Sequence, residues 1–342
     1  MTHYCDLTDI RSIQLDHTSR CNLACPQCPR TPNDWNKDRV IPPNNLDLTV
    51  EDYERIFAPL IPNADKTRIL HVGNYGDALA SPTFTETLDW CKQYPWPVIQ
   101  VHTNGSLRTP DYYEYLARQQ VRLVFAIDGL EDTNHIYRVN SNWDRLWNNV
   151  LAFIRAGGSA SWDYLEFEHN AHQTETAREL AARTGFTRFN VKQTPRFAAS
   201  NRTQQIIQTK KQTYTIKDTP RSKPQQVEQQ IIKQWGTKEQ FQRQASVRCK
   251  TVRLRNFFVD FNCTVYPCCW LANEPYRYKS NPGKRSILFQ QYSNTDPHWN
   301  SLRHHTWEEI LAHDFYSKDL INSWDNPDTR IVTCSNECGV KP

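Results

Sequence analysis

Residues 12–28 read SIQLDHTSRCNLACPQC, a short apolar segment followed by three cysteines. Ser12–Asp16 predicts a strand, and Cys21, Cys25 and Cys28 supply three thiolates with no His, Asp or Glu between them. A structural zinc site closes its coordination with four protein ligands. Three cysteines on a [4Fe–4S] cluster instead leave one iron open to a small molecule. The spacing therefore favours an iron–sulfur site with open coordination, and a zinc knuckle is the alternative.

The chain up to about residue 192 alternates short apolar segments with amphipathic ones, which is the pattern of repeated strand–helix units around a parallel sheet. The fold class expected is α/β, a partial (β/α)6 TIM-like barrel followed by a small C-terminal α+β iron–sulfur domain. In such barrels the chemistry lies on loops at the C-terminal ends of the strands, where the three cysteines are expected. The later strands are predicted at 67–72, 97–102, 122–127, 164–167 and 188–192, and the helices from Thr49 and over 84–94, 110–117, 143–155 and 175–183.

The composition changes after residue 196, and three regions are expected: a barrel over 1–196, a linker over 197–247 and a C-terminal domain over 248–342. The middle region is rich in Gln, Lys and Thr, which favours a polar, solvated linker with a short helix over 227–235; a binding role is the alternative. The C-terminal domain is expected to hold a hairpin of 254–258 with 265–270, and a helix over 306–320.

Composition excludes several classes of protein. No apolar run approaches the ~20 residues needed to cross a bilayer, so no membrane partner is expected. The first ten residues lack an export signal, so a cytoplasmic location is expected. An odd count of eleven cysteines in such a chain argues against a disulfide scaffold and for metal binding. A net charge of +4 over 342 residues is weak evidence for nucleic acid, and the aromatic residues lie in apolar segments rather than among Lys and Arg.

The Cys-x3-Cys-x2-Cys motif at Cys21, Cys25 and Cys28, with Leu23 and Pro26 inside it, resembles that of the radical S-adenosylmethionine (radical SAM) superfamily. The resemblance implies that a [4Fe–4S] cluster binds the amino and carboxylate groups of S-adenosyl-L-methionine through its open iron. An electron from the cluster then cleaves the cofactor, and the 5′-deoxyadenosyl radical removes hydrogen from a substrate. A reductant such as flavodoxin or ferredoxin is implied as a partner.

Two later segments are similar to cofactor-binding motifs of that superfamily. GNYGD at 73–77 follows the second strand, where the family has a Gly-Gly-Glu-Pro-like segment whose backbone meets the methionine amino group. Gly76 and Asp77 are therefore expected at the cofactor, although Asp77 stands in place of Glu and no Pro follows. Thr103 and Asn104, after the third strand, resemble the family's Thr-Asn-Gly turn.

Three further positions are implied by the same resemblance. AIDG at 126–129 is similar to a Ser-Leu-Asp-Gly motif, so Asp128 is expected near the cofactor, while Ala126 replaces the usual serine. Arg138 matches an arginine expected near the methionine carboxylate, which guanidinium chemistry favours; a surface role is its alternative. Val191 on the sixth strand is a candidate for the adenine pocket, or else a core residue.

Residues 260–269, DFNCTVYPCC, resemble the hairpin of the SPASM and shorter twitch auxiliary-cluster domains found in this superfamily. The resemblance implies one auxiliary [4Fe–4S] cluster, with Cys263 or Cys269 as possible substitutes in its ligand set. A zinc ribbon is the alternative, since its ligands are also four cysteines. Whether the cluster accepts electrons or only holds the domain together stays open. The ligand set implied is Cys249, Cys268, Cys334 and Cys338.

The function expected is that of a radical SAM oxidoreductase or modifying enzyme, acting on a small molecule or a peptide. The alternative is a non-enzymatic zinc or iron–sulfur protein, possibly associated with nucleic acid through stacking aromatics. A catalytic base is expected but not assigned. The candidates at predicted strand ends are Asp16, His71, His102, Glu166, Glu168, His169 and Lys192.

Overall fold

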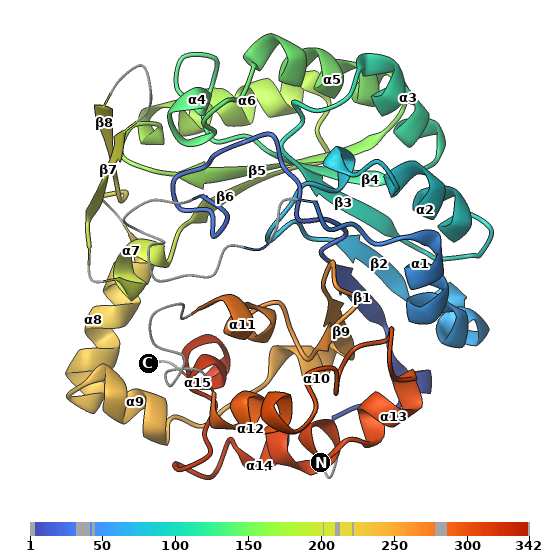
Figure 1. The fold of residues 1–342 in the computed structure, drawn as a ribbon. Helices are drawn as coiled ribbons and strands as arrows, with labels where there is room; N and C mark the ends of the chain where they lie inside the picture. The colour runs from blue at the N-terminus through green and yellow to red at the C-terminus, as the bar shows by residue number, and fades with distance from the viewer. Residues whose placement is uncertain are drawn as a thin grey trace.

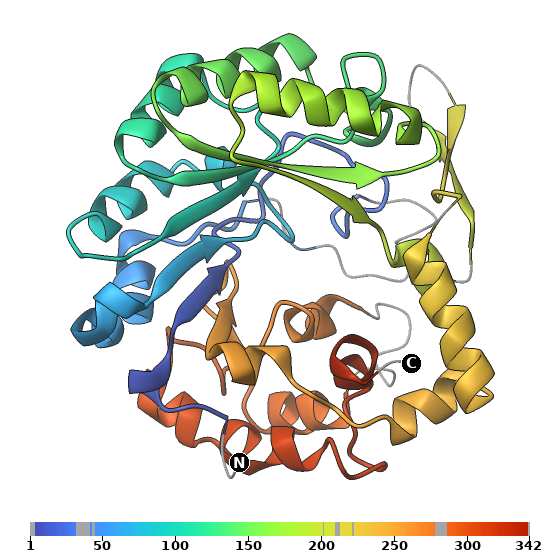
Figure 2. The ribbon, with the colours of Figure 1, turned by 180° about the vertical axis from the view of Figure 1, so that it is seen from behind.

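A computed structural model describes residues 4–31, 42, 45–200, 202–208, 213–220, 222–277 and 286–340. Figure 1 shows a curved sheet whose outer side is covered by helices, and a smaller, mainly helical part next to β1. The view from behind in Figure 2 shows the same two parts, connected by a column of helices at the open edge of the sheet.

The sheet has eight strands in the order β10-β9-β1-β2-β3-β4-β5-β6. The strands β1 to β6 pair in sequence and all in parallel, which confirms the predicted α/β partial barrel. The strand β5 starts at residue 159, earlier than predicted. Their bounds are β1 (Ser12–Leu15), β2 (Arg68–His71), β3 (Ile99–Thr103), β4 (Arg122–Ala126), β5 (Ser159–Glu166) and β6 (Arg188–Gln193).

The helices between these strands cover the outer face of the sheet (Figure 1). A capping box between Thr49 and Asp52 starts the first of them, and Tyr53, Ile56 and Phe57 on that helix are fully buried. In the described part of the chain, no helix combines the length and apolar composition needed to cross a membrane. The helices of the barrel are α1 (Val50–Phe57), α2 (Phe84–Cys91), α3 (Pro110–Arg118), α4 (Asn134–Tyr137), α5 (Trp143–Arg155) and α6 (Thr174–Thr184).

The C-terminal part continues the same sheet. The strand β9 (Asn256–Val259) pairs in parallel with β1, and β10 (Val265–Tyr266) pairs with β9 in the antiparallel sense, which is the predicted hairpin with different ends. Leu254 belongs to helix α10 (Lys250–Leu254), which ends where Arg255 adopts a left-handed conformation. The second strand stops before Pro267, which has no N–H to donate to a ladder.

The described residues of 197–247 form a hairpin and helices, where the sequence predicted a solvated linker with one short helix. The strands β7 (Gln204–Gln208) and β8 (Thr213–Lys217) form an antiparallel hairpin, followed by α8 (Lys223–Trp235) and α9 (Lys238–Gln244). Alternate side chains of the hairpin are buried, which a solvated segment would not require. The polar composition hides this because most of the outward-facing residues of the two strands are Gln, Thr or Lys.

The predicted helix over 306–320 is interrupted. Its first part is α13 (Trp307–Ala312), and a π-helical turn η7 (Phe315–Asp319) precedes α14 (Leu320–Asn322). The break lies at His313, whose backbone is extended. The remaining helices are α7 (Arg196–Ala199), α11 (Glu274–Arg277), α12 (Ile287–Thr295) and α15 (Val332–Cys338).

The β7–β8 hairpin offers a matched pair for testing its burial. Ile216 is completely buried, whereas Ile206 on the paired strand is 62% exposed. Replacement Ile216→Ala should lower the free energy of unfolding by about 2–5 kcal/mol because it empties packed space. Ile206→Ala should change it by less than about 0.5 kcal/mol. Urea denaturation measures both, and equal effects would contradict the packing described.

Candidate functional site

The three N-terminal cysteines lie on the loop that leaves the C-terminal end of β1. A turn in which Cys28 N donates to Cys25 O at 2.9 Å brings the last two together. All three belong to one apolar cluster that is separate from the barrel core, and Ile207 and Ile216 of the β7–β8 hairpin pack in it as well. The hairpin therefore packs against the cysteine loop, in which Cys25 is buried and Cys21 and Cys28 are partly exposed.

Donor groups surround the sulfur atoms of this loop. Leu23 N lies 3.4 Å from Cys21 Sγ, Asn104 Nδ2 lies 3.8 Å from it, and Arg138 Nη1 lies 3.9 Å from Cys25 Sγ. Burial raises the pKa of Cys21 to about 12 and that of Cys25 to about 11, so both are thiols unless a metal displaces their protons. The donor set suits thiolates held on a metal.

Among the described residues, no three His, Cys, Asp or Glu side chains converge closely enough to hold one metal ion. Ligands of a zinc ion meet at bonding distance around a single point. In a four-iron cluster each cysteine bonds a different iron, so the sulfurs stand farther apart.

Asp77 joins the loops that follow β2 and β3. Its carboxylate oxygen Oδ2 accepts from Thr103 Oγ1 at 2.9 Å and from both N and Nδ2 of Asn104 at 2.8 Å, and Oδ1 accepts from Leu79 N. Burial raises the pKa of Asp77, and these hydrogen bonds oppose the shift. Three predicted cofactor residues are thus brought into one network, which reaches Cys21 through Asn104.

Gly76 is held against the cysteine loop. A Cβ atom at this position would lie 2.0 Å from Thr18 O and 2.9 Å from Arg20 O. Asp77 N also donates to Arg20 O at 2.8 Å. A glycine is required here because one backbone segment approaches another, which fixes the loop after β2 next to the loop that carries Cys21.

Asp128 and Arg138 form the second polar group next to the cysteines. Arg138 Nε donates to Asp128 Oδ2 at 2.6 Å, and Leu165 N donates to the other oxygen at 2.8 Å. Burial raises the pKa of Asp128. Burial also acts to lower the pKa of Arg138, but the neighbouring Asp128 carboxylate outweighs this effect and keeps the pKa of Arg138 above its usual value. Both predicted residues therefore lie beside Cys25, and the surface alternative for Arg138 is wrong.

Val191 lies apart from these groups. It is 36% exposed, so the core alternative is wrong. Val191 is paired in register with Tyr164, so the two side chains are on the same face of the sheet. The ring of Tyr164 packs against Phe189 on that face, and Asp163 points to the opposite face. Val191 therefore lies on the outer face of β6, where the structure does not join it to the cysteine loop.

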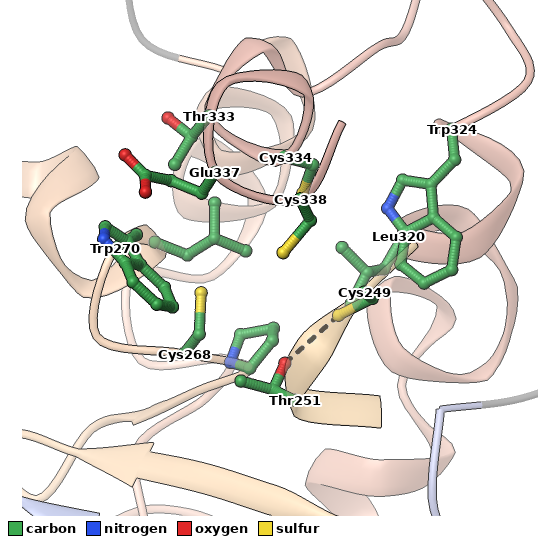
Figure 3. A pocket seen from close by; sticks show the side chains of 12 residues that line it. Cys249, Thr251, Cys268, Trp270, Leu320, Trp324, Thr333, Cys334, Glu337 and Cys338 are labelled. Atoms are coloured by element: carbon green, nitrogen blue, oxygen red, sulfur yellow. Dashed lines mark hydrogen bonds between the residues drawn. The ribbon is translucent and has the colours of Figure 1, made fainter. Parts of the chain in front are cut away.

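The C-terminal cysteines surround one pocket. Cys249, Cys268, Cys334 and Cys338 all line it, and Figure 3 shows the sulfur atoms of Cys249, Cys268 and Cys338 directed into the same space. A hydrogen bond with Cys338 lowers the pKa of Cys249, and Cys249 Sγ also lies 3.2 Å from Thr251 Oγ1. The rest of the lining is mainly apolar: Pro267, Trp270, Leu271, Leu320 and Trp324.

The two alternative cysteines lie outside this pocket. Cys263 is fully buried in the main core and has a left-handed backbone at the β9–β10 turn. Cys269 follows Cys268, but it is next to Asp16 and Asn74 of the barrel. The four predicted ligands are therefore together, and Cys263 and Cys269 are not with them. No disulfide joins the eleven cysteines, all of which are described.

Further residues outside the predicted site set complete the first site. Asn22 accepts from Asn104 Nδ2 and donates to Ser106 Oγ, both at 3.0 Å. Gln205 and Tyr214 of the hairpin contact the loop region through Pro26 O and Ile136 O. The two short segments QQIIQ at 204–208 and TYTIK at 213–217, with their β-branched and aromatic residues, were the available signal for the hairpin. Asn22 lies inside the cysteine motif, whereas no pattern in the sequence marks Ser106.

No protein-family model and no curated protein sequence matches the chain. Solved structures match most of it. SuiB from Streptococcus suis bound to S-adenosylmethionine has a TM-score of 0.52 and 13% identity, over 95% of this chain and 77% of that chain. Native anSMEcpe with bound AdoMet has a TM-score of 0.59 and 12% identity, over 96% of this chain and 89% of that chain. Both structures contain bound S-adenosylmethionine.

The chain shares the fold of these two structures. The match extends over the barrel and the C-terminal part together, since almost the whole chain is covered. A structure of anSMEcpe with AdoMet and the Cp18Cys peptide is similar to the chain with a TM-score of 0.53 and 13% identity, over 92% of this chain and 83% of that chain. A fold alone does not fix a function, so the cysteine sites must carry the functional argument.

The close approach at Gly76 gives a direct test of how the cysteine loop is held. Gly76→Ala should push the loops apart, lower the free energy of unfolding by about 1–3 kcal/mol and speed alkylation of the buried Cys25 in the metal-free protein. Gly157→Ala is the control, because nothing lies within 4 Å of its added Cβ although its φ is +83°. That control should be destabilised without faster alkylation of Cys25. Equal alkylation rates in both variants would contradict the account.

Proposed function

We propose that the chain is a radical SAM enzyme with one auxiliary iron–sulfur cluster. The observation that carries this proposal is the position of the three cysteines, at the C-terminal end of β1 and inside a network of residues expected at the cofactor. A second group of four cysteines in one pocket supports the auxiliary cluster. The fold shared with SuiB and anSMEcpe agrees with the assignment.

Cys21, Cys25 and Cys28 would hold the first cluster, which, when bound, supplies one electron to split S-adenosylmethionine into methionine and a radical that removes hydrogen from substrate. The chain's own residues then have separate tasks. Arg138 keeps N–H groups beyond its bond to Asp128 that suit a carboxylate of the cofactor. Asp77 keeps the turns after β2 and β3 in a fixed position. The β7–β8 hairpin packs against the cysteine loop.

Cys249, Cys268, Cys334 and Cys338 would hold the auxiliary cluster. The donor set fits because four thiols enclose one apolar pocket, and an enclosed cluster has no iron open to a ligand. With no open iron it can pass electrons or stabilise the domain. A four-cysteine zinc site is the competing assignment, and metal analysis separates the two.

The substrate class is a peptide or a small molecule. SuiB is seen with its precursor peptide SuiA, and anSMEcpe with the Cp18Cys peptide, which supports a peptide for this chain. A flavodoxin or ferredoxin would supply the electrons. The cysteines must stay reduced in order to bind iron, and the cytoplasm keeps thiols reduced. We therefore propose a cytoplasmic location.

The two-cluster assignment predicts a stepwise loss of iron. Anaerobic reconstitution of the full chain should give about eight irons per chain. Cys25→Ser and Cys334→Ser should each give about four, and only Cys25→Ser should abolish release of 5′-deoxyadenosine with dithionite and S-adenosylmethionine. Iron and zinc are measured by atomic emission, and the nucleoside by mass spectrometry.

Cys91→Ser is the matched control, since Cys91 is buried in the barrel core and belongs to neither site. It should retain all the iron and the activity. Stoichiometric zinc with no cleavage of S-adenosylmethionine would overturn the proposal in favour of a non-enzymatic metal protein.

The proposed role of Arg138 predicts a binding defect. Arg138→Met should weaken binding of S-adenosylmethionine by about 10- to 100-fold, because a charge-assisted pair is lost. Arg178→Met, which removes an exposed arginine paired with Glu175, should leave affinity unchanged. Isothermal titration of the reconstituted protein measures both. Wild-type affinity in Arg138→Met would exclude the residue from the cofactor site.

A further inference from the structure

Asp16 is a fully buried carboxyl group with one oxygen that has no partner in the described part of the chain. It follows β1 and is 1% exposed. Asn74 N donates to Oδ1 at 2.7 Å, while Oδ2 is buried without a hydrogen bond. A buried polar atom left without a partner is costly, so it marks a place where a ligand group or water completes the hydrogen bonding.

The position of Asp16 is set by the pairing of β1 with β9. Asp16 N donates to Val259 O at 3.0 Å, and the register places Leu15 opposite Val259. Asp260 therefore lies beside Asp16 at the same edge of the sheet. Its Oδ1 accepts from Asn262 N and Thr264 N, while its Oδ2 is also buried without a partner. The carboxyl groups of Asp16 and Asp260 thus lie side by side where β1 and β9 end, and each has one oxygen without a hydrogen bond.

Asp16 and Asp260 lie between the two cysteine sites. On one side, four residues separate Asp16 from Cys21, and Asn74, which donates to Asp16, lies two residues before Gly76 at the cysteine loop. On the other side, Asn74 is followed by Tyr75, whose hydroxyl donates to Asn273, and Asn273 Nδ2 donates to Cys269 O at 2.8 Å. Cys269 is the direct neighbour of pocket residue Cys268. A group bound at Asp16 would therefore lie where the barrel and the C-terminal part meet.

The other candidate bases are engaged or face elsewhere. His71 packs its ring against His17, Tyr53 and Phe84 on the helix side of the sheet. Glu168 pairs with Lys217 at the surface.

Three more candidates have partners within the barrel. Glu166 accepts from Thr174, Gln193 and Thr219. Lys192 is paired with Asp163, and His102 Nε2 lies 3.1 Å from Gln100 Nε2.

His169 is the remaining rival. Both of its ring nitrogens are buried without a partner among the described residues. Its ring stacks on Phe167, which belongs to the apolar cluster of the cysteine loop, so it lies near the first site but has no link to the C-terminal pocket. Asp16 is the candidate that connects to both.

We propose that the Asp16 carboxylate is the proton acceptor for the substrate. This rests on the proposed function, under which the substrate first loses a hydrogen atom from carbon. The carbon radical then loses the proton of an adjacent O–H, N–H or S–H group to Asp16 and one electron to the cluster proposed at the C-terminal pocket, and a C=O, C=N or C=S bond forms. The substrate is accordingly an alcohol, amine or thiol with a hydrogen on the same carbon.

The electrostatic surroundings suit a proton acceptor near neutral pH. Burial raises the pKa of Asp16 to about 8, hydrogen bonds from the backbone of Asn74 and Tyr75 oppose the shift, and the charge of Asp260 adds to it. The other titratable groups that face it are Cys269 and Tyr276. Because the folded pKa lies above that of an ordinary carboxyl, Asp16 gains its charge only as pH rises toward 8, and product formation should rise over that range.

Infrared spectroscopy tests the protonation without substrate. The reconstituted full chain should show a carboxylic-acid C=O band that disappears with a midpoint near pH 8, and Asp16→Asn should lack it. Asparagine keeps the shape and the acceptor for Asn74 N, so the variant should fold. If no pH-sensitive band is lost in Asp16→Asn, the proposal is overturned.

Turnover tests the catalytic role. The probes are short peptides deuterated at the α- and β-carbons of Ser, Thr and Cys, and a parallel set of deuterated sugar alcohols. Asp16→Asn should still release 5′-deoxyadenosine and take deuterium from the reacting probe, yet form the product lighter by two hydrogens at least about 100-fold more slowly. Glu168→Gln, at a carboxyl group that pairs with Lys217 at the surface, should match the wild type, and His169→Gln should lose far less product formation than Asp16→Asn does.

Wild-type product formation by Asp16→Asn, or a loss in His169→Gln alone, would overturn the assignment and leave the proposed function intact. Absence of 5′-deoxyadenosine from the wild type itself would instead overturn the proposed function, and the step at Asp16 with it. The two failures are therefore distinguishable.

Discussion

The parallel pairing of β1 with β9 is the constraint on which both cysteine sites depend. The strand β1 lies between β2 and β9, so one strand positions the loop with Cys21, Cys25 and Cys28, and its neighbour leads through the β9–β10 hairpin to Cys268. Parallel strands present their C-terminal ends at one edge of a sheet. The loop with Cys21, Cys25 and Cys28 leaves this edge directly, whereas β10 runs antiparallel to β9 and leads back along it to Cys268, so the second group of cysteines lies beside β9 although more than two hundred residues separate the two groups in the chain.

Buried polar contacts then fix the loops at that edge. Asp77 connects the turns after β2 and β3, and Gly76 lets the first of these turns lie against the backbone of Thr18. Arg138 and Asp128 do the same between the loop after β4 and Cys25. Each contact replaces solvent by a preorganised donor or acceptor, which is the environment in which a reactive radical is protected from water.

Much of this was predictable from local patterns. The strands β1 to β6 coincide with apolar segments, which a parallel sheet buries on both faces. The cysteine group at 21–28 and the ligand set of the C-terminal pocket were expected from their motifs. Thr103, Asn104 and Asp77 were expected at one place, and they form one network. Local sequence sufficed here because each motif directly follows a strand, and the topology of the sheet then brings the strand ends together.

The rest depended on tertiary contacts that no local pattern encodes. The β7–β8 hairpin has a polar composition because only Ile207 and Ile216 and their neighbours face the cysteine loop, so composition indicated a linker. Val191 is apolar yet lies on the outer face of an edge strand, which its sequence does not reveal. The pairing of β1 with β9 joins residues far apart in the chain, and the significance of Asp16 emerges only with it.

The central claim is that three cysteines leave one iron of the first cluster open to S-adenosylmethionine. It is tested most directly by the electron paramagnetic resonance spectrum of the dithionite-reduced Cys334→Ser protein, in which the first cluster should be the remaining one, before and after addition of S-adenosylmethionine. The account predicts that the cofactor shifts the spectrum of the reduced cluster. An unchanged spectrum at saturating cofactor, from a protein with its iron in place, would contradict it.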